Sequence, residues 1–160
     1  MIKLYHGSNT KVETPDLIHS KPFKDFGKGF YLSADKQQAW DLAYQKVRQI
    51  QSGKATVSEF LFDETLMQSS ELKVLSYTDY CEEWALFVLK NRNTTVSQPV
   101  HDYDIIYGPI ADDGVTYQLR RYQGGVISLS QLIEELKYAK GITFQYYFGT
   151  EKALKKLTAI

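Results

Sequence analysis

Apolar and polar residues alternate over several short stretches of the chain, and a period of two is typical of strands that bury one face. The clearest stretch is 55–62, in which Ser58, Phe60 and Phe62 would share one face of a sheet. Shorter apolar stretches bounded by turn residues predict further strands at 2–6, 30–32, 72–75, 105–107 and 142–148.

Between these strands, apolar residues recur at helical spacing. Asp35 is a suitable N-cap for a helix that runs to about Gln51, with Gln38 as the second half of a capping box. Further helices are expected at 80–93, from Ser128 or Ser130 to 138, and after 150, whereas 115–122 fits a helix or a strand. This order of elements predicts an α+β fold, with two facing, mostly antiparallel sheets and peripheral helices.

The composition suits one domain spanning 1–160, and its 19 basic residues balance its 19 acidic residues. A zero net charge disfavours a dedicated nucleic-acid or anionic-membrane binder, which normally has a basic excess. The single cysteine excludes an internal disulfide, and no signal peptide or membrane-length apolar run is recognisable, so a cytoplasmic protein is expected. We expect Cys81 on the apolar face of its helix, because the adjacent Glu82 and Glu83 would disfavour a reactive thiolate.

Gly27 and Gly29 form the most distinctive local pattern, because they lie one residue apart directly before the strand 30–32. Glycine lets a backbone turn tightly and approach a ligand closely. Tyr31 and the helix that follows would then bring backbone donors and a flat ring to one place. The same pattern fits an ordinary turn between a strand and a helix, in which the glycines only meet conformational needs.

His6 is expected at the end of the first strand, directly before Gly7 and Ser8. Its imidazole and the exposed glycine backbone would be available to a ligand at this position. A half-buried histidine that bonds to a local carbonyl fits the same pattern.

The strand 142–148 carries a polar residue between aromatic ones. Its three aromatic residues at even positions share one face, which we expect to face the core. Gln145 would then point to the opposite side, between Thr143 and Tyr147.

Asp112 and Asp113 follow the buried strand 105–107 and a Gly-Pro turn. Adjacent carboxylates can bind a metal or a ribose, but aspartates before a glycine are also common turn formers. The nearest imidazole is His101, and no metal-ligand spacing accompanies it. No metal is therefore expected.

Three segments together resemble a known superfamily: Leu4-Tyr5-His6-Gly7-Ser8, then 26–32 with a helix behind it, then the late strand around Gln145. They are similar to the diphtheria-toxin-type ADP-ribosyltransferases, and in particular to the poly(ADP-ribose) polymerase branch. That branch has a His-Gly-Ser or His-Gly-Thr strand end and a Gly-Lys-Gly-Ile-Tyr-Phe-like strand. More closely, the chain resembles a family of small bacterial proteins of unassigned function.

The resemblance implies a split β-sandwich and NAD as the co-substrate. His6 would hold ribose hydroxyls, the Gly7 backbone would pair with the nicotinamide amide, and Tyr31 would stack on the nicotinamide ring. Gln145 falls where the polymerases place a glutamate that bonds the ribose 2′-hydroxyl. The implied catalytic set is His6, Tyr31 and Gln145.

The chain departs from the polymerases at Ala39, where they usually have a serine that bonds the carboxamide. Trp40 or Tyr44, which we also expect on the core-facing side of their helix, would supply wall area instead. The further NAD contacts that we expect are Ser8, Gly29 and Asp112.

The implied activity is mono-ADP-ribosyl transfer from NAD to a protein or nucleic acid, with release of nicotinamide. In a toxin-like effector of this kind, a cognate antitoxin would be a partner. Two alternatives stay open: an NAD glycohydrolase, with water as the acceptor, and a catalytically silent module that binds NAD or ADP-ribose.

Overall fold

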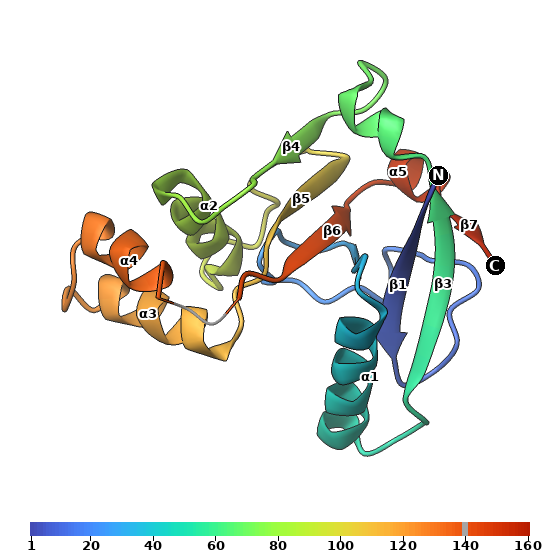
Figure 1. The fold of residues 1–160 in the computed structure, drawn as a ribbon, viewed down its shortest axis with the longest axis horizontal. Coiled ribbons are helices and arrows are strands. Elements are labelled where there is room, and N and C mark those ends of the chain that lie inside the picture. The colour runs from blue at the N-terminus through green and yellow to red at the C-terminus, as the bar shows by residue number, and fades with distance from the viewer. Residues whose placement is uncertain (139–140) are drawn as a thin grey trace.

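A computed structural model of the chain describes residues 1–138 and 141–160, which form an α+β fold with two sheets (Figure 1). The three-stranded sheet is antiparallel and has the order β1-β3-β7, with β1 at Ile2–Ser8, β3 at Thr56–Phe62 and β7 at Thr158–Ala159. The four-stranded sheet has the order β2-β6-β5-β4, with β2 at Phe30–Leu32, β4 at Val74–Ser76, β5 at Ile105–Pro109 and β6 at Phe144–Phe148. Only β4 and β5 pair in parallel there, as expected of mostly antiparallel sheets.

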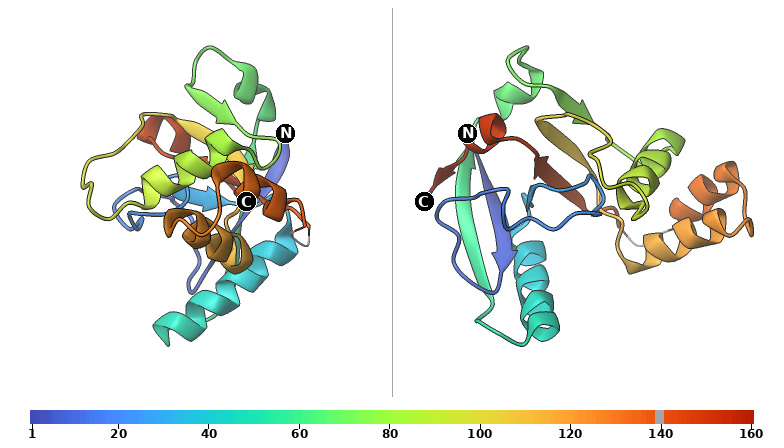
Figure 2. Two further views of the ribbon diagram at one scale, coloured as in Figure 1. Left: turned by 90° about the vertical axis from the view of Figure 1, so that its left-hand side faces the viewer. Right: turned by 180° about the vertical axis from the view of Figure 1, so that it is seen from behind.

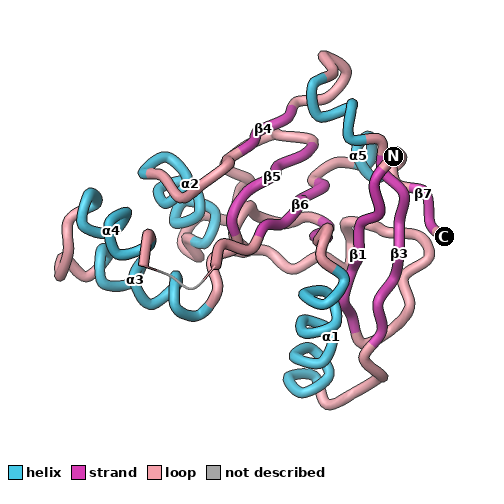
Figure 3. Tube along the Cα trace, viewed as in Figure 1, coloured by secondary structure: helices cyan, strands magenta, loops and turns pink. Residues whose placement is uncertain are grey.

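The helices flank the two sheets. They are α1 (Lys36–Ile50), α2 (Glu82–Arg92), α3 (Asp113–Gln123), α4 (Leu129–Leu136), α5 (Glu151–Leu154) and the 3₁₀ helix η1 (Glu64–Gln68). The views in Figures 1 and 2 place α1 beside β1, and α2, α3 and α4 on the far side of the four-stranded sheet. Figure 3 shows that the long connection between β1 and β2 is loop. No helix in the described chain is long and apolar enough to cross a membrane.

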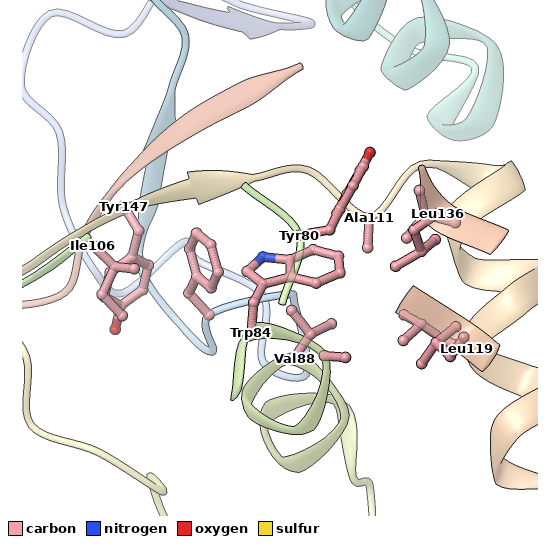
Figure 4. Packing of buried hydrophobic residues seen from close by; sticks show 12 residues of the cluster. Tyr80, Trp84, Val88, Ile106, Ala111, Leu119, Leu136 and Tyr147 are labelled. Atoms are coloured by element: carbon pink, nitrogen blue, oxygen red, sulfur yellow. The ribbon is translucent and has the colours of Figure 1, made fainter. Parts of the chain in front are cut away.

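Two apolar clusters cover the two faces of the four-stranded sheet. The first lies between the sheets, and its buried members are Leu4, Phe30, Leu32, Phe60, Phe62, Leu72, Ile105, Phe148, Ala153 and Leu154. The second joins β5 and β6 to α2, α3 and α4 (Figure 4). At its centre Trp84 is fully buried, and its indole Nε1 donates to the carbonyl of Pro109 at 3.1 Å.

The predicted alternation of β6 is confirmed, because Phe148 is buried in the cluster between the sheets and Gln145 lies on the opposite face; that second face is covered as well. Gln145 and Tyr147 are buried on the side of α2, whereas Phe144 and Tyr146 are only half-buried. Tyr31 on β2 pairs with Tyr147, so Tyr31 and Gln145 are diagonal neighbours on one sheet face. The register of the sheet thus brings together two residues that are far apart in the sequence.

The N-terminus of α1 is predicted correctly at Asp35, whose carboxylate accepts from the backbone N–H of Gln37 at 2.9 Å. The capping box is wrong, because the Gln38 amide instead donates to the carbonyl of Phe144 at 3.3 Å. The buried line of this helix consists of Ala39 and Ala43.

Cys81 is the N-cap of α2, and it also packs against the apolar cluster that α2 helps to form, as predicted. Its sulfur accepts from the backbone N–H of Trp84 at 3.4 Å. Burial raises the pKa of the Cys81 thiol. A raised pKa disfavours the thiolate and agrees with a structural role.

Candidate functional site

Two neighbouring cavities meet at Tyr31. The Gln145 cavity, of about 890 Å³, lies between α1 and α3 and is also lined by Asp25 and Arg92. The His6 cavity, of about 660 Å³, lies between α1 and the loop that follows β1. Both volumes are within the range of small-molecule sites. The lining that the cavities share is Lys24, Tyr31, Leu42 and Gln45.

Tyr31 is held rigidly at this junction. Its hydroxyl accepts from the backbone N–H of Phe26 at 3.0 Å and donates to the carbonyl of Gly27 at 2.7 Å. Burial and the nearby Asp25 carboxylate raise the pKa of the Tyr31 phenol well above its ordinary value. The Lys24 ammonium lies 5.3 Å from the ring centroid, so a ligand that stacks on this face would displace a cation.

His6 is fixed as a neutral imidazole. Its Nδ1 lies 2.7 Å from the Tyr31 carbonyl oxygen, which can only accept, so the proton is on Nδ1 and Nε2 has a free lone pair. Burial, followed by the Lys46 ammonium, lowers the pKa of His6 to about 4. The ring stacks on Phe30 with a centroid distance of 4.2 Å. The expectation of a half-buried histidine bonded to a carbonyl is confirmed, but the carbonyl belongs to Tyr31 and is not local; Nε2 still remains available as an acceptor.

The strand β1 continues past His6 to Ser8, so His6 is not its last residue. Tyr5 exchanges both backbone hydrogen bonds with Ser33, each at 2.8 Å, along the edge opposite β3. Backbone groups alternate along a strand, so Gly7 presents its N–H and C=O to this same edge. Ser8 lines the His6 cavity, and its contact with NAD stays a prediction.

Gly7 itself is required by close packing. A Cβ at this position would lie 1.9 Å from the carbonyl oxygen of Ala39 on α1. Gly7 is not among the described residues that line the two cavities. Its predicted pairing with a nicotinamide amide therefore remains a prediction.

The glycine pair before β2 is explained by conformation and packing. Gly27 has a φ of 90°, in the left-handed region that favours glycine. A Cβ on Gly29 would lie 2.2 Å from the ring of Tyr147, whose hydroxyl donates to the carbonyl of Lys28 at 3.0 Å. The ordinary-turn interpretation thus accounts for Gly27, whereas Gly29 is required by packing and also lines the His6 cavity.

Gln145 belongs to a buried polar network at the base of its cavity. Its Nε2 donates to Oδ2 of Asp25 at 2.9 Å, and the backbone N–H of Ala111 donates to the same oxygen at 2.9 Å. The other oxygen, Oδ1, accepts from Nε of Arg92 at 2.9 Å and also from Nη2. Arg92 donates further to the hydroxyl of Thr116 and the carbonyl of Ala111. Asp25 thus joins the loop before β2 to α2, β6 and the residues before α3.

This network determines how the Gln145 amide points. A carboxylate can only accept, so the amide nitrogen must face Asp25 and the amide oxygen must face away. No fully buried side-chain oxygen or nitrogen of the described residues lacks a partner. The structure gives no partner for Oε1, so this oxygen is accessible from the cavity that Gln145 lines. The site therefore contains an oriented, uncharged acceptor.

Three other expected NAD contacts are placed differently. Asp112 lines the Gln145 cavity, but its carboxylate caps α3 by accepting from the backbone N–H of Val115 at 2.9 Å. In the described part of the chain, neither Trp40 nor Tyr44 lines either cavity. The face of α1 that lines the cavities instead carries Leu42 and Gln45, so the wall contacts of Trp40 and Tyr44 stay predictions. Among residues 1–138 and 141–160, no group of three or more His, Cys, Asp or Glu could hold a metal ion.

The sequence alone did not identify Asp25 and Arg92 as site residues. They lie 67 positions apart, and each resembles an ordinary surface charge in its local sequence. The only local signal for Asp25 is its position beside Phe26 and Gly27, where a charge interrupts a segment that becomes buried.

Comparison with known proteins places the chain in a family but assigns no activity. No curated protein and no solved structure matches the chain. One family model matches residues 2–159, which is nearly the whole chain, and its description is "Protein of unknown function (DUF3990)". The chain belongs to this family, DUF3990.

Proposed function

We propose that this protein is an NAD-dependent mono-ADP-ribosyltransferase, which moves ADP-ribose from NAD to a macromolecular acceptor. One arrangement carries the proposal: two uncharged acceptors, His6 Nε2 and Gln145 Oε1, flank Tyr31 in adjoining cavities. The ribose hydroxyls of a dinucleotide can donate to acceptors of this kind. The motif resemblance around His6, Tyr31 and Gln145 supports the same assignment.

In this mechanism the protein positions NAD and stabilises developing charge. His6 Nε2 accepts from a ribose hydroxyl, and Gln145 Oε1 accepts from the 2′-hydroxyl of the nicotinamide ribose. The bond between the ribose C1′ and the nicotinamide nitrogen breaks, and its electron pair stays with nicotinamide. A nucleophile of the acceptor then forms the new bond to C1′ and releases its proton to solvent.

An amide at position 145 makes a slower enzyme than a carboxylate would. A hydrogen bond to a carboxylate contributes about 1.5–3 kcal/mol, and a neutral one about 0.5–1.5 kcal/mol. The difference of about 1–2 kcal/mol corresponds to roughly tenfold in rate. This loss is compatible with transfer to an acceptor that is bound close to the reacting carbon.

Two alternatives have specific support. Water in place of a macromolecule would make the protein an NAD glycohydrolase, which needs the same site. A catalytically silent module that binds NAD or ADP-ribose is favoured by the position of the Lys24 ammonium over Tyr31 and by the absence of a carboxylate at residue 145. A toxin-like effector in the cytoplasm, with a cognate antitoxin as its partner, belongs to the proposal and rests on the resemblance alone.

Nicotinamide release from NAD tests the proposal. The purified protein is incubated with NAD, released nicotinamide is quantified by chromatography, and a lysate is searched by mass spectrometry for added ADP-ribose. We expect release and protein or nucleic-acid adducts, with most release lost in Gln145→Met and retained in the exposed control Gln68→Met. Release without adducts would identify a glycohydrolase, and NAD binding without release would identify a silent module. Neither binding nor release would refute all three.

A further inference from the structure

Four lysines line the His6 cavity: the exposed Lys11, which follows β1, and three others from two different elements. Lys21 and Lys24 belong to the loop before β2, and Lys46 belongs to α1. None of the three forms a salt bridge with any residue that the structure describes. The cavity therefore has positive charge that the described protein does not neutralise by contact.

The positive charges of these lysines also repel one another. Burial, followed by the neighbouring Lys24 and Lys21 ammonium groups, lowers the pKa of Lys46 to about 8. Burial and Lys21 lower the pKa of Lys24, against a smaller opposite effect of Asp25. Like charges in a partly desolvated site cost free energy, and a bound anion offsets that cost.

The acidic residues of the same cavity do not neutralise these lysines. Glu13 and Asp16 also line it, but Asp16 is bonded to the exposed ring of His19. Glu13 is exposed and forms no salt bridge within residues 1–138 and 141–160. Neither acid forms an ion pair with Lys21, Lys24 or Lys46.

The cavity also offers neutral donors. The serine and threonine residues that line it are Ser8, Thr10, Thr14 and Ser20. Ammonium groups act as compact point charges toward phosphate, and hydroxyls complete the contacts to phosphoryl oxygens. A volume of about 660 Å³ is sufficient for a small organic phosphate.

We propose that the His6 cavity is a binding site for a small diphosphate-bearing ligand, held through its phosphoryl oxygens by Lys21, Lys24 and Lys46. The inference depends on this cavity and its charges, and it holds whether or not the Gln145 cavity supports ADP-ribosyl transfer. It also gives Lys24 a second position, because a bound anion would draw its ammonium away from the Tyr31 ring and uncover that ring.

Titration calorimetry with inorganic pyrophosphate at constant ionic strength tests the site. We expect the wild-type protein to bind, and Lys46→Gln and Lys24→Gln each to weaken binding about tenfold, as for loss of one charge-assisted hydrogen bond. The matched control is Lys155→Gln, which removes the same charge from an exposed position outside the cavities and should bind as the wild type does. Lys46→Gln relieves repulsion in the folded protein, so its melting temperature should not fall.

Three outcomes would overturn the proposal. The wild-type protein does not bind pyrophosphate, the cavity variants bind as tightly as the wild type, or Lys155→Gln weakens binding as much as they do. A separate binding measurement uses a single-stranded oligonucleotide in place of pyrophosphate. Binding of the oligonucleotide through the same lysines, without binding of pyrophosphate, would assign the cavity to nucleic acid instead. Pyrophosphate contains no nicotinamide, so a negative result here is distinct from a failure of the proposed transferase.

Discussion

Replacing Gln145 by glutamate tests the buried network directly. The substitution exchanges the amide nitrogen, which donates to Asp25 at 2.9 Å, for a carboxylate oxygen that cannot donate. Two carboxylates would then lie side by side in a buried site. At a charge separation of about 4 Å and an effective dielectric constant of about 20, their repulsion is about 4 kcal/mol. The Arg92 guanidinium on the other Asp25 oxygen reduces this figure, which is therefore an upper bound.

The pair can avoid repulsion by binding one proton. For a glutamate with an ordinary pKa of about 4.3, protonation costs about 4 kcal/mol at pH 7 and about 1 kcal/mol at pH 5. The protonated carboxyl group of the introduced glutamate would donate to Asp25 in place of the amide. The folded variant then binds more protons than its unfolded chain, so its stability falls as the pH rises.

The assay is urea unfolding followed by tryptophan fluorescence at pH 5, 6.5 and 8. We expect Gln145→Glu to lose about 1 kcal/mol relative to the wild type at pH 5 and up to about 4 kcal/mol at pH 8. The control Gln145→Met also loses the bond to Asp25 but introduces no charge, so its loss should be the same at each pH. In the double variant with Asp25→Asn, the pH-dependent part of the loss should disappear. A constant difference between Gln145→Glu and Gln145→Met from pH 5 to 8 would refute the contact.

Two further predictions concern other positions. Between pH 6.5 and about 4, the unfolded chain binds a proton on His6 that the folded protein excludes. The free energy of unfolding should therefore fall on acidification by at most about 3 kcal/mol. The variant His6→Asn should remove this part of the pH profile, and the exposed control His19→Asn should leave it unchanged. Gly29→Ala should cost about 1–3 kcal/mol in urea unfolding, because its Cβ would lie 2.2 Å from the Tyr147 ring. Gly114→Ala, in α3 and with no atom nearer than 3.5 Å, should be neutral or stabilising; equal losses in both glycine variants would contradict the packing argument.

The element order was predictable because it depends on local signals. Alternation identified β3, and the N-caps Asp35 and Ser128 marked the starts of α1 and α4. The burial of Gln145 was not predictable in this way. Apolar alternation places Gln145 opposite the core between the sheets, but it does not show that α2, α3 and α4 cover this second face. That coverage is a tertiary property, and it buries Gln145.

The candidate site was predictable only in part, for a related reason. The motif residues His6 and Tyr31 lie in short segments that carry their own pattern, and the fold places both at the cavities. The groups that orient them come from distant segments. The Tyr31 carbonyl, 25 positions away, sets the His6 tautomer, and Asp25, 120 positions away, sets the Gln145 amide. Pairings of this range have no local signature.

The two cavities differ in charge, and this difference orients the proposed ligand. At the base of the Gln145 cavity, the Asp25 carboxylate is neutralised by Arg92, and it also accepts hydrogen bonds from Ala111 and Gln145. This end therefore favours an uncharged group. In the His6 cavity, Lys21 and Lys46 have no ion-pair partner among the described residues, so that end favours an anion. Under the two proposals together, a ligand with phosphates at one end and a neutral ribose at the other would place its phosphates in the His6 cavity. A ribose, rather than a phosphate, would then lie at the oxygen of Gln145.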